Sequence, residues 1–154
     1  MDLITKTYIR PSQKVSTIVK DNPILLLVLE NFGVSRIGKD LTVSQLCKTM
    51  GLNVNLFLMI CNLHNGFYIE KVKKVNPSDI PAIINYLSQG HRYYLKEKYP
   101  EIRGFIKRIG KSAKSNFMLV MESYFDEYFR EVKEHILYEE KIAFPTLIIK
   151  KYID

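Results

Sequence analysis

The chain reads His135-Ile-Leu-Tyr-Glu139-Glu140-Lys-Ile-Ala-Phe144-Pro145 near its end, and this stretch decides the fold. Residues four apart lie on one side of a helix, about one turn from each other, so His135 and Glu139 share a face. The surrounding apolar residues follow the helical period and place both side chains within or beside a core-facing stripe: Phe117, Val120, Met121, Tyr124, Phe125, Tyr128, Val132, Ile136, Ile142 and Ala143. An ionised Glu facing a core is costly unless a positive group holds it, and a metal ion is one such group.

The second half of the chain predicts a helical hairpin. An apolar pattern of helical period covers residues 78–109, and Pro100 inside it predicts a kink or a local break. The turn is expected at 110–114 and the last long helix at 115–143, with Pro145 as a stop or bend. Stripes this wide cannot be buried in one helix pair. Two more helices are therefore expected, from the N-terminal half, from a second copy or from further chain, and we favour a longer protein.

The first half of the chain predicts short helices whose ends carry recognisable signals. Pro23 suits a first helical turn, Thr42 can cap the helix that follows it, and Gly51 suits a helix end. The predicted helices cover residues 14–20, 23–31, 43–50 and 53–63, and a short extended piece is expected at 3–9. The sequence thus predicts an all-α protein in three parts: a small helical domain (1–70), a linker (71–78) and a long helical hairpin (79–154).

The composition indicates a folded cytoplasmic protein. Of the 154 residues 47% are hydrophobic and 25% charged, which is ordinary for a globular chain. The N-terminus has no apolar signal segment, and the run Pro23 to Leu29 is far too short to span a bilayer. Cys47 and Cys61 occupy helical core positions without CxxC spacing, which favours buried thiols in a reducing compartment. The net charge of +7 comes largely from two short basic runs that we interpret as solvated connectors.

The candidate site residues are His91, His135 and Glu139. His91 lies on the apolar stripe of the first long helix, so two facing helices would contribute the three side chains. Three nitrogen and oxygen ligands suit non-haem iron or manganese better than structural zinc, which normally uses cysteines. Glu140, about 100° further round the helix, is predicted to lie at the surface. A hydrogen-bonded core histidine and an ordinary His–Glu pair within one helix are the alternatives.

Two stretches resemble the RIC family, di-iron proteins that repair iron centres. The first resembles that family's short N-terminal domain and covers residues 14–66, through Val15-Ser-Thr-Ile-Val19, Asn22-Pro23, Leu29-Glu-Asn-Phe-Gly-Val34 and Leu41-Thr-Val-Ser-Gln-Leu-Cys47. The second, residues 79–147, resembles the first half of the family's hemerythrin-like four-helix bundle. It matches through Ile83-Ile-Asn-Tyr-Leu87, His91, Tyr94-Leu95, Tyr99-Pro-Glu-Ile102, and the stretch from His135 to Pro145.

The resemblance implies a di-iron centre in which His91 and His135 are terminal ligands and Glu139 bridges the irons. It also implies a non-enzymatic role in repairing iron centres under nitric oxide or oxidative stress, with iron-cluster proteins as partners. The chain departs from the family at His91-Arg92, where a His–His pair is common, and at Phe32-Gly33, where a cysteine pair is absent. The ligands of the third and fourth bundle helices are also missing, so a homodimer or missing C-terminal helices would have to complete the centre.

Two other functions compete with metal binding. Residues 42–62 have the outline of a helix-turn-helix, but no Arg or Lys lies between Gly51 and Glu70, so nucleic-acid binding is disfavoured. A metal-free interaction module, whose apolar stripe awaits a partner, is the second alternative. Hydrolytic or nucleophilic catalysis has no motif to support it.

Overall fold

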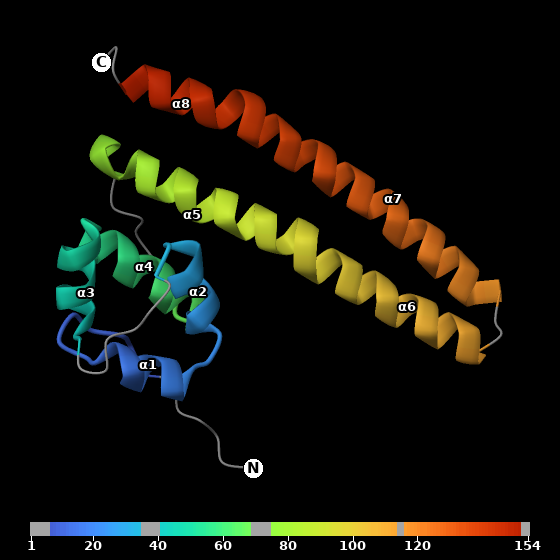
Figure 1. Ribbon diagram of the computed structural model, residues 1–154, viewed down its shortest axis with the longest axis horizontal. Coiled ribbons are helices and arrows are strands. Elements are labelled where there is room, and N and C mark those ends of the chain that lie inside the picture. Colours follow the sequence, from blue (N-terminus) through green and yellow to red (C-terminus); the bar gives the residue numbers. More distant parts are fainter. Residues whose placement is uncertain (1–6, 35–40, 69–74, 114–115, 152–154) are drawn as a thin grey trace. The chain divides into compact units, whose positions relative to one another are not determined.

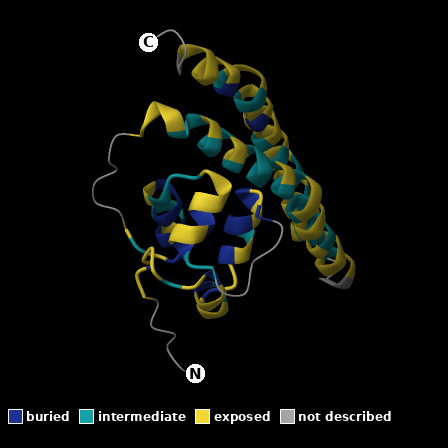
Figure 2. Cartoon of the chain, turned by 60° about the vertical axis from the view of Figure 1, so that its left-hand side comes forward, coloured by how far each residue is buried: buried dark blue, intermediate teal, exposed yellow. Residues whose placement is uncertain are grey.

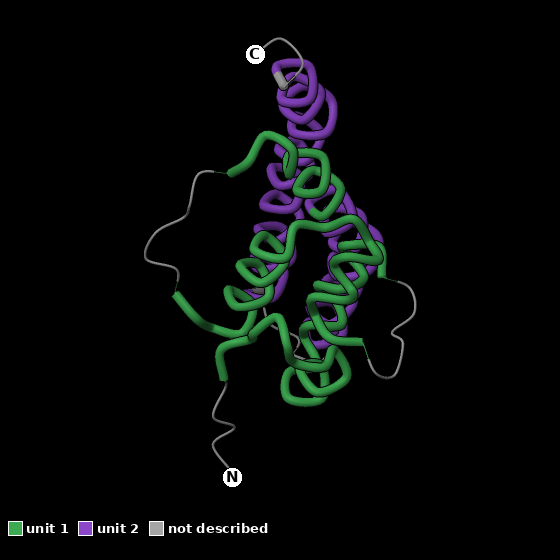
Figure 3. Tube along the Cα trace, turned by 90° about the vertical axis from the view of Figure 1, so that its left-hand side faces the viewer, with its two compact units in different colours: residues 1–86 green, residues 87–154 purple. Residues whose placement is uncertain are grey.

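The computed structural model describes residues 7–34, 41–68, 75–113 and 116–151. The all-α prediction is confirmed: in these ranges the only β-type pairing is an isolated antiparallel bridge between Lys14 and Thr42. The chain forms two compact units, residues 1–86 and 87–154 (Figure 3). Residues 71–74 of the predicted linker lie outside the described residues, and the division between the units falls within a helix. No helix of the described ranges has the length and apolar character needed to cross a bilayer.

Unit 1 contains four short helices close to the predicted positions. They are α1 (Val15–Asp21), α2 (Leu25–Asn31), α3 (Val43–Met50) and α4 (Val54–His64), followed by a 3₁₀ turn at Pro77–Asp79. The predicted Thr42 cap is confirmed, because its side chain accepts from the Gln45 amide while Gln45 bonds back to the Thr42 amide. Gly51 ends α3 with φ 65°, a left-handed conformation that favours glycine.

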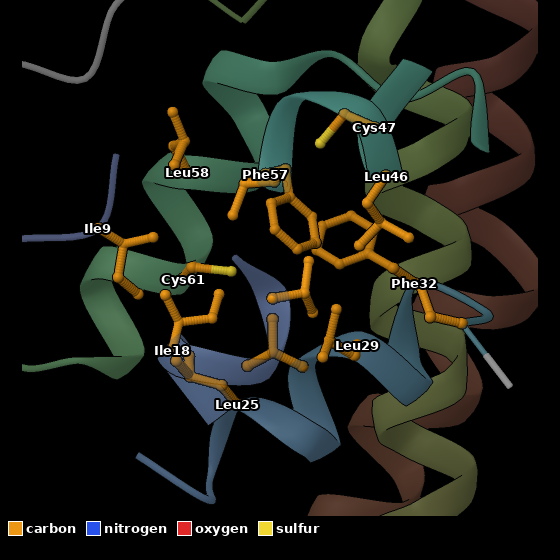
Figure 4. Packing of buried hydrophobic residues seen from close by; sticks show 14 residues of the cluster. Ile9, Ile18, Leu25, Leu29, Phe32, Leu46, Cys47, Phe57, Leu58 and Cys61 are labelled. Carbon is orange, nitrogen blue, oxygen red and sulfur yellow. The ribbon is translucent and has the colours of Figure 1, made fainter. Parts of the chain in front are cut away.

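The core of unit 1 gathers around α4, which buries residues on most of its circumference (Figures 2 and 4). Phe57 and Cys61 are fully buried there, and the tilted ring of Phe32 lies 5.2 Å from that of Phe57. The remaining members come from the N-terminal segment and the other short helices: Ile9, Val15, Ile18, Leu25, Val28, Leu29, Val34, Val43, Leu46, Cys47 and Leu58. The prediction that Cys47 and Cys61 are buried is confirmed, and burial raises their pKa values to about 11 and about 12.

Buried asparagines tie the N-terminal segment to α4. Asn62 is fully buried, accepts from the Ile9 amide at 2.7 Å and donates to the Ile9 carbonyl at 3.1 Å. Asn65 donates to the Thr7 carbonyl at 2.7 Å and accepts from the Asn22 amide group at 3.0 Å. Because buried polar groups are costly without partners, this network fixes where the segment lies on the helix.

Unit 2 is the predicted antiparallel hairpin. Its first arm comprises α5 (Ile80–Tyr93), a π-helical segment (Tyr94–Lys98) and α6 (Tyr99–Ala113), with α5 entering unit 2 at Leu87. The second arm comprises α7 (Asn116–Tyr138), another π-helical segment (Glu139–Ala143) and α8 (Phe144–Lys151). The two arms run side by side in opposite directions (Figure 1).

Both interior prolines follow a π-helical turn. Pro100 and Pro145 each come second in the α-helix after that turn, preceded by Tyr99 and Phe144. A proline lacks the backbone donor and clashes with the carbonyl one α-turn back, and a wider π turn relieves both problems. The predicted local break at Pro100 is thus a π-helical turn. The prediction that the last helix stops or bends at Pro145 is wrong as a stop, because helix continues to Lys151.

The predicted turn between the arms is too long. Helix α6 continues through Ala113, so Gly110 is helical rather than part of a turn, and residues 114–115 lie outside the described ranges. A Cβ at Gly110 would lie 3.6 Å from the Met118 Cβ, an ordinary van der Waals contact. The space beside Gly110 is thus taken up by the other arm.

An ionic and aromatic contact joins α6 to α7. Arg103 donates from Nε and Nη2 to the two oxygens of Asp126, both at 2.7 Å, and the Tyr99 hydroxyl donates to the same carboxylate at 2.9 Å. The Tyr99 ring stacks on Phe125, 5.5 Å between centroids. Bidentate pairing gives this contact geometric specificity, so it fixes the register of the hairpin.

The apolar stripe predicted on the last long helix divides into two faces. Phe125, Val132 and Ile136 are half-buried or buried toward the other arm. A second row is exposed and repeats every three or four residues along α7: Phe117, Met121, Tyr124 and Tyr128. A matching exposed row on α6 comprises Ile102, Phe105 and Ile109. Both rows lie about a quarter turn to the same side of the contact line, so in an antiparallel pair they form one surface. We call these seven residues the open face.

The Arg103–Asp126 pair should be visible in an acid titration. The Arg103 guanidinium, hydrogen-bonded to Asp126, lowers the pKa of that carboxyl from 3.8 to about 2. Since the folded-state pKa is the lower one, the pair stabilises the hairpin fully above pH 3.8, and this contribution is lost as the pH falls toward about 2. Carboxyl ¹³C NMR should show Asp126 titrating near pH 2 in the wild type and close to 3.8 in Arg103→Gln. Arg130→Gln, which removes a guanidinium that pairs with exposed Glu127 on the same helix, is the control. An Asp126 that titrates at its ordinary value in wild-type protein contradicts this description.

Candidate metal centre

The three predicted site residues lie together in unit 2. His91 comes from α5, His135 from the end of α7, and Glu139 from the first position of the second π-helical segment. The antiparallel register of the hairpin brings α5 beside this segment. His91 and Glu139, which are 48 residues apart in the sequence (139 less 91), are therefore in direct contact.

Glu139 contacts both imidazoles, one with each oxygen. Its Oε2 lies 3.2 Å from His91 Nε2, and its Oε1 lies 3.3 Å from His135 Nε2. The side chains differ in exposure: His91 is 18% exposed, Glu139 28% and His135 69%. The carboxylate is therefore shared by a largely covered imidazole and one that lies open to solvent.

Glu140 is also part of the site, a contact that the sequence did not predict, although its side chain remains 35% exposed. Its Oε1 lies 2.8 Å from His91 Nδ1, and its Oε2 accepts a hydrogen bond from the Ser88 hydroxyl at 3.0 Å. The prediction assumed α-helical rotation, but Glu139 and Glu140 begin a π-helical segment, whose wider turn changes the direction of the side chains. The one sequence signal for this was Phe144-Pro145, which requires an altered turn before it.

The donor atoms form two pairs that share one carboxylate. Ligand bonds of about 2.1 Å place neighbouring ligands of one metal about 3.0–3.4 Å apart, for right-angled to tetrahedral geometry. Both Nε2–Glu139 distances match that separation. Nowhere in the described ranges do three or more His, Cys, Asp or Glu side chains form a group able to hold one metal ion. The same distances are those of ordinary His–Glu ion pairs, so a metal ion at either contact would need further ligands.

The other candidates from the sequence belong to unit 1. His64, the last residue of α4, is exposed as predicted, and its Nε2 is 2.9 Å from the Tyr86 hydroxyl. Helix α4, the second helix of the helix-turn-helix outline, buries Leu56, Phe57 and Cys61 in the core of unit 1. A recognition helix needs an exposed polar face, so the arrangement gives nucleic-acid reading no support.

Comparison with protein-family models, with curated proteins and with solved structures finds no match to this chain.

Proposed function

We propose that this protein binds iron through His91, His135 and Glu139, as one half of a di-iron centre. The resemblance to the RIC family suggests that the complete centre serves the repair of iron centres damaged by nitric oxide or oxidants. On this proposal the protein is a non-enzymatic, cytoplasmic iron-binding protein, and iron-cluster proteins are its clients. The raised pKa values of Cys47 and Cys61 leave the thiols protonated and support no thiolate chemistry in its place.

The observation that carries the proposal is the position of the Glu139 carboxylate. A carboxylate whose two oxygens each face a different imidazole nitrogen has the arrangement needed to bridge two metal ions. Imidazole and carboxylate ligands suit iron, whereas a structural zinc site normally uses cysteines. Paired helices that each present inward-facing ligands are the usual support for such centres in helical bundles.

A second copy of this chain is the proposed source of the missing ligands. The open face exposes 69% of Tyr124, 67% of Phe117 and 49% of Phe105, which is unusual for a row of large apolar side chains. His135 follows Tyr128 by seven residues and so continues this row. A second hairpin packed on the open face would cover His135 and complete a four-helix arrangement with four imidazoles and two Glu139 carboxylates.

The charges of the two arms are complementary and favour this partner. Helix α6 carries four basic residues and one acidic residue: Arg103, Lys107, Arg108 and Lys111 against Glu101. Helix α7 carries five acidic and two basic residues: Glu122, Asp126, Glu127, Glu131 and Glu134 against Arg130 and Lys133. When α6 of one copy lies beside α7 of the other, each basic α6 has an acidic α7 on both sides in the bundle, so neighbouring helices carry opposite charge. We therefore propose that the bundle alternates α6 and α7.

The iron site is tested by removing its donor atoms. Glu139→Ala should remove bridged metal altogether, and His135→Ala should weaken binding by more than the about 10–100-fold typical of outer-shell partners. Iron per chain is measured by mass spectrometry after anaerobic dialysis against Fe²⁺. His64→Ala, an exposed imidazole on α4, is the matched control and should bind as the wild type. The proposal is contradicted if neither the wild type nor the variants bind iron and the substitutions only lower thermal stability. That result would favour a metal-free interaction module.

The second copy is tested by charging the open face. Tyr124→Glu places a carboxylate in the centre of that face and should convert a dimer into a monomer that has lost its iron. Leu119→Glu is the control, because Leu119 is 66% exposed against 69% for Tyr124 but lies on the opposite side of α7. Light scattering during size-exclusion chromatography gives the mass. A monomeric wild type, or equal disruption by both variants, would remove the second copy from the proposal.

A further inference from the structure

We infer that Glu140 is a positioning residue, which holds the His91 ring so that Nε2 is directed toward the metal position at Glu139. The inference rests on the proposed function, because it assumes that His91 binds metal through Nε2. It assigns a role to a residue that helical periodicity placed on the surface.

The contacts of Glu140 indicate which atom carries the hydrogen between His91 and Glu140. An ionised carboxylate is an acceptor only, so the 2.8 Å contact from Nδ1 to Glu140 Oε1 requires that Nδ1 carries the hydrogen and donates it. The second oxygen of Glu140 accepts from the Ser88 hydroxyl at 3.0 Å. Ser88 precedes His91 by three residues on α5, so it lies on the same helix face as the imidazole. The carboxylate is therefore held at both oxygens from one helix.

The plane of the imidazole is fixed from another direction. The ring of Phe144 stacks on His91 with 5.8 Å between centroids and 5° between planes. Phe144 is only 6% exposed, so its ring is held in place by the surrounding side chains. Glu140 at the edge and Phe144 at the face together restrict rotation about both side-chain torsions. With Nδ1 committed to Glu140, the only nitrogen available to a metal is Nε2, 3.2 Å from Glu139 Oε2.

This arrangement matches what metal-binding histidines require. Such a histidine usually donates its second ring N–H to a carboxylate or carbonyl, which sets the tautomer, orients the ring and makes the ligating nitrogen more basic. The π-helical segment achieves this with adjacent residues: Glu139 serves Nε2 and Glu140 serves Nδ1 of the same ring.

The test measures the His91 hydrogen bond and metal affinity separately. In metal-free protein, NMR of ¹⁵N-labelled imidazole should show a His91 Nδ1–H that exchanges slowly with water. Glu140→Ala should abolish that slow exchange, and Glu140→Gln should retain it, because the amide oxygen still accepts. Binding of Zn²⁺, a d¹⁰ ion suited to NMR, should weaken by about 10–100-fold in Glu140→Ala and by less in Glu140→Gln. Glu134→Ala removes an exposed acid of the same arm and should change neither.

The outcomes separate the two proposals. A slowly exchanging Nδ1–H that persists in Glu140→Ala, or unchanged Zn²⁺ affinity in that variant, overturns the positioning role. If His91→Ala abolishes Zn²⁺ binding while Glu140→Ala does not, the proposed metal site stands and this inference alone fails. A wild type that binds neither Zn²⁺ nor Fe²⁺ removes the proposed function and the metal-positioning role together. Rescue by Glu140→Gln supports the role and excludes a general loss of packing.

Discussion

The contact of Glu139 with two imidazoles is the constraint on which the arrangement of unit 2 depends. It requires an antiparallel register that sets α5 against the second π-helical segment, and the bidentate Arg103–Asp126 pair fixes that register further along the hairpin. It also requires positive charge, because a half-buried carboxylate has lost part of its hydration. Imidazoles from two helices provide hydrogen-bond partners, and a bound metal ion would provide the charge. The Glu139 side chain thus serves both the register of the hairpin and the proposed binding of a metal ion.

The open face connects the proposed metal site to the association of two copies. A hairpin alone leaves much of Phe105, Phe117 and Tyr124 in water, and the exposed part of these side chains adds no stability until another surface covers it. His135 lies along the same row and is the most exposed of the donor residues. On the proposed account, a second copy covers the open face and completes the ligands of the metal site in the same step. Metal content and oligomeric state should change together, since each copy contributes half of the ligand set.

Local signals in the sequence predicted the local structure well. Thr42 with Gln45 and the left-handed Gly51 define α3 through interactions within a few residues, so the prediction needed no knowledge of the rest of the fold. The helical period likewise predicted that His91 and Glu139 approach each other, because an inward position on each of two paired helices is a strong restriction. His135 follows from the spacing of four residues to Glu139, although its side chain is 69% exposed. The continuation of helix past Pro145 and the contacts of Glu140 with His91 were not predicted, for a shared reason. A π-helical turn depends on whether the neighbouring helix accepts the wider backbone, which no local pattern records. Gly110 was assigned to a turn, whereas it lies within α6.

The most direct test of the account measures iron content and molecular mass on one sample of the wild-type chain. The protein is purified without chelator, loaded anaerobically with Fe²⁺, and passed through size-exclusion chromatography with light scattering before elemental analysis of the peak. The account predicts a mass of about twice 18.0 kDa, with roughly one iron per chain bound at the two positions that Glu139 joins. A folded monomer of 18.0 kDa without iron would contradict it, and would leave the His–Glu contacts as ordinary hydrogen bonds of a helical hairpin.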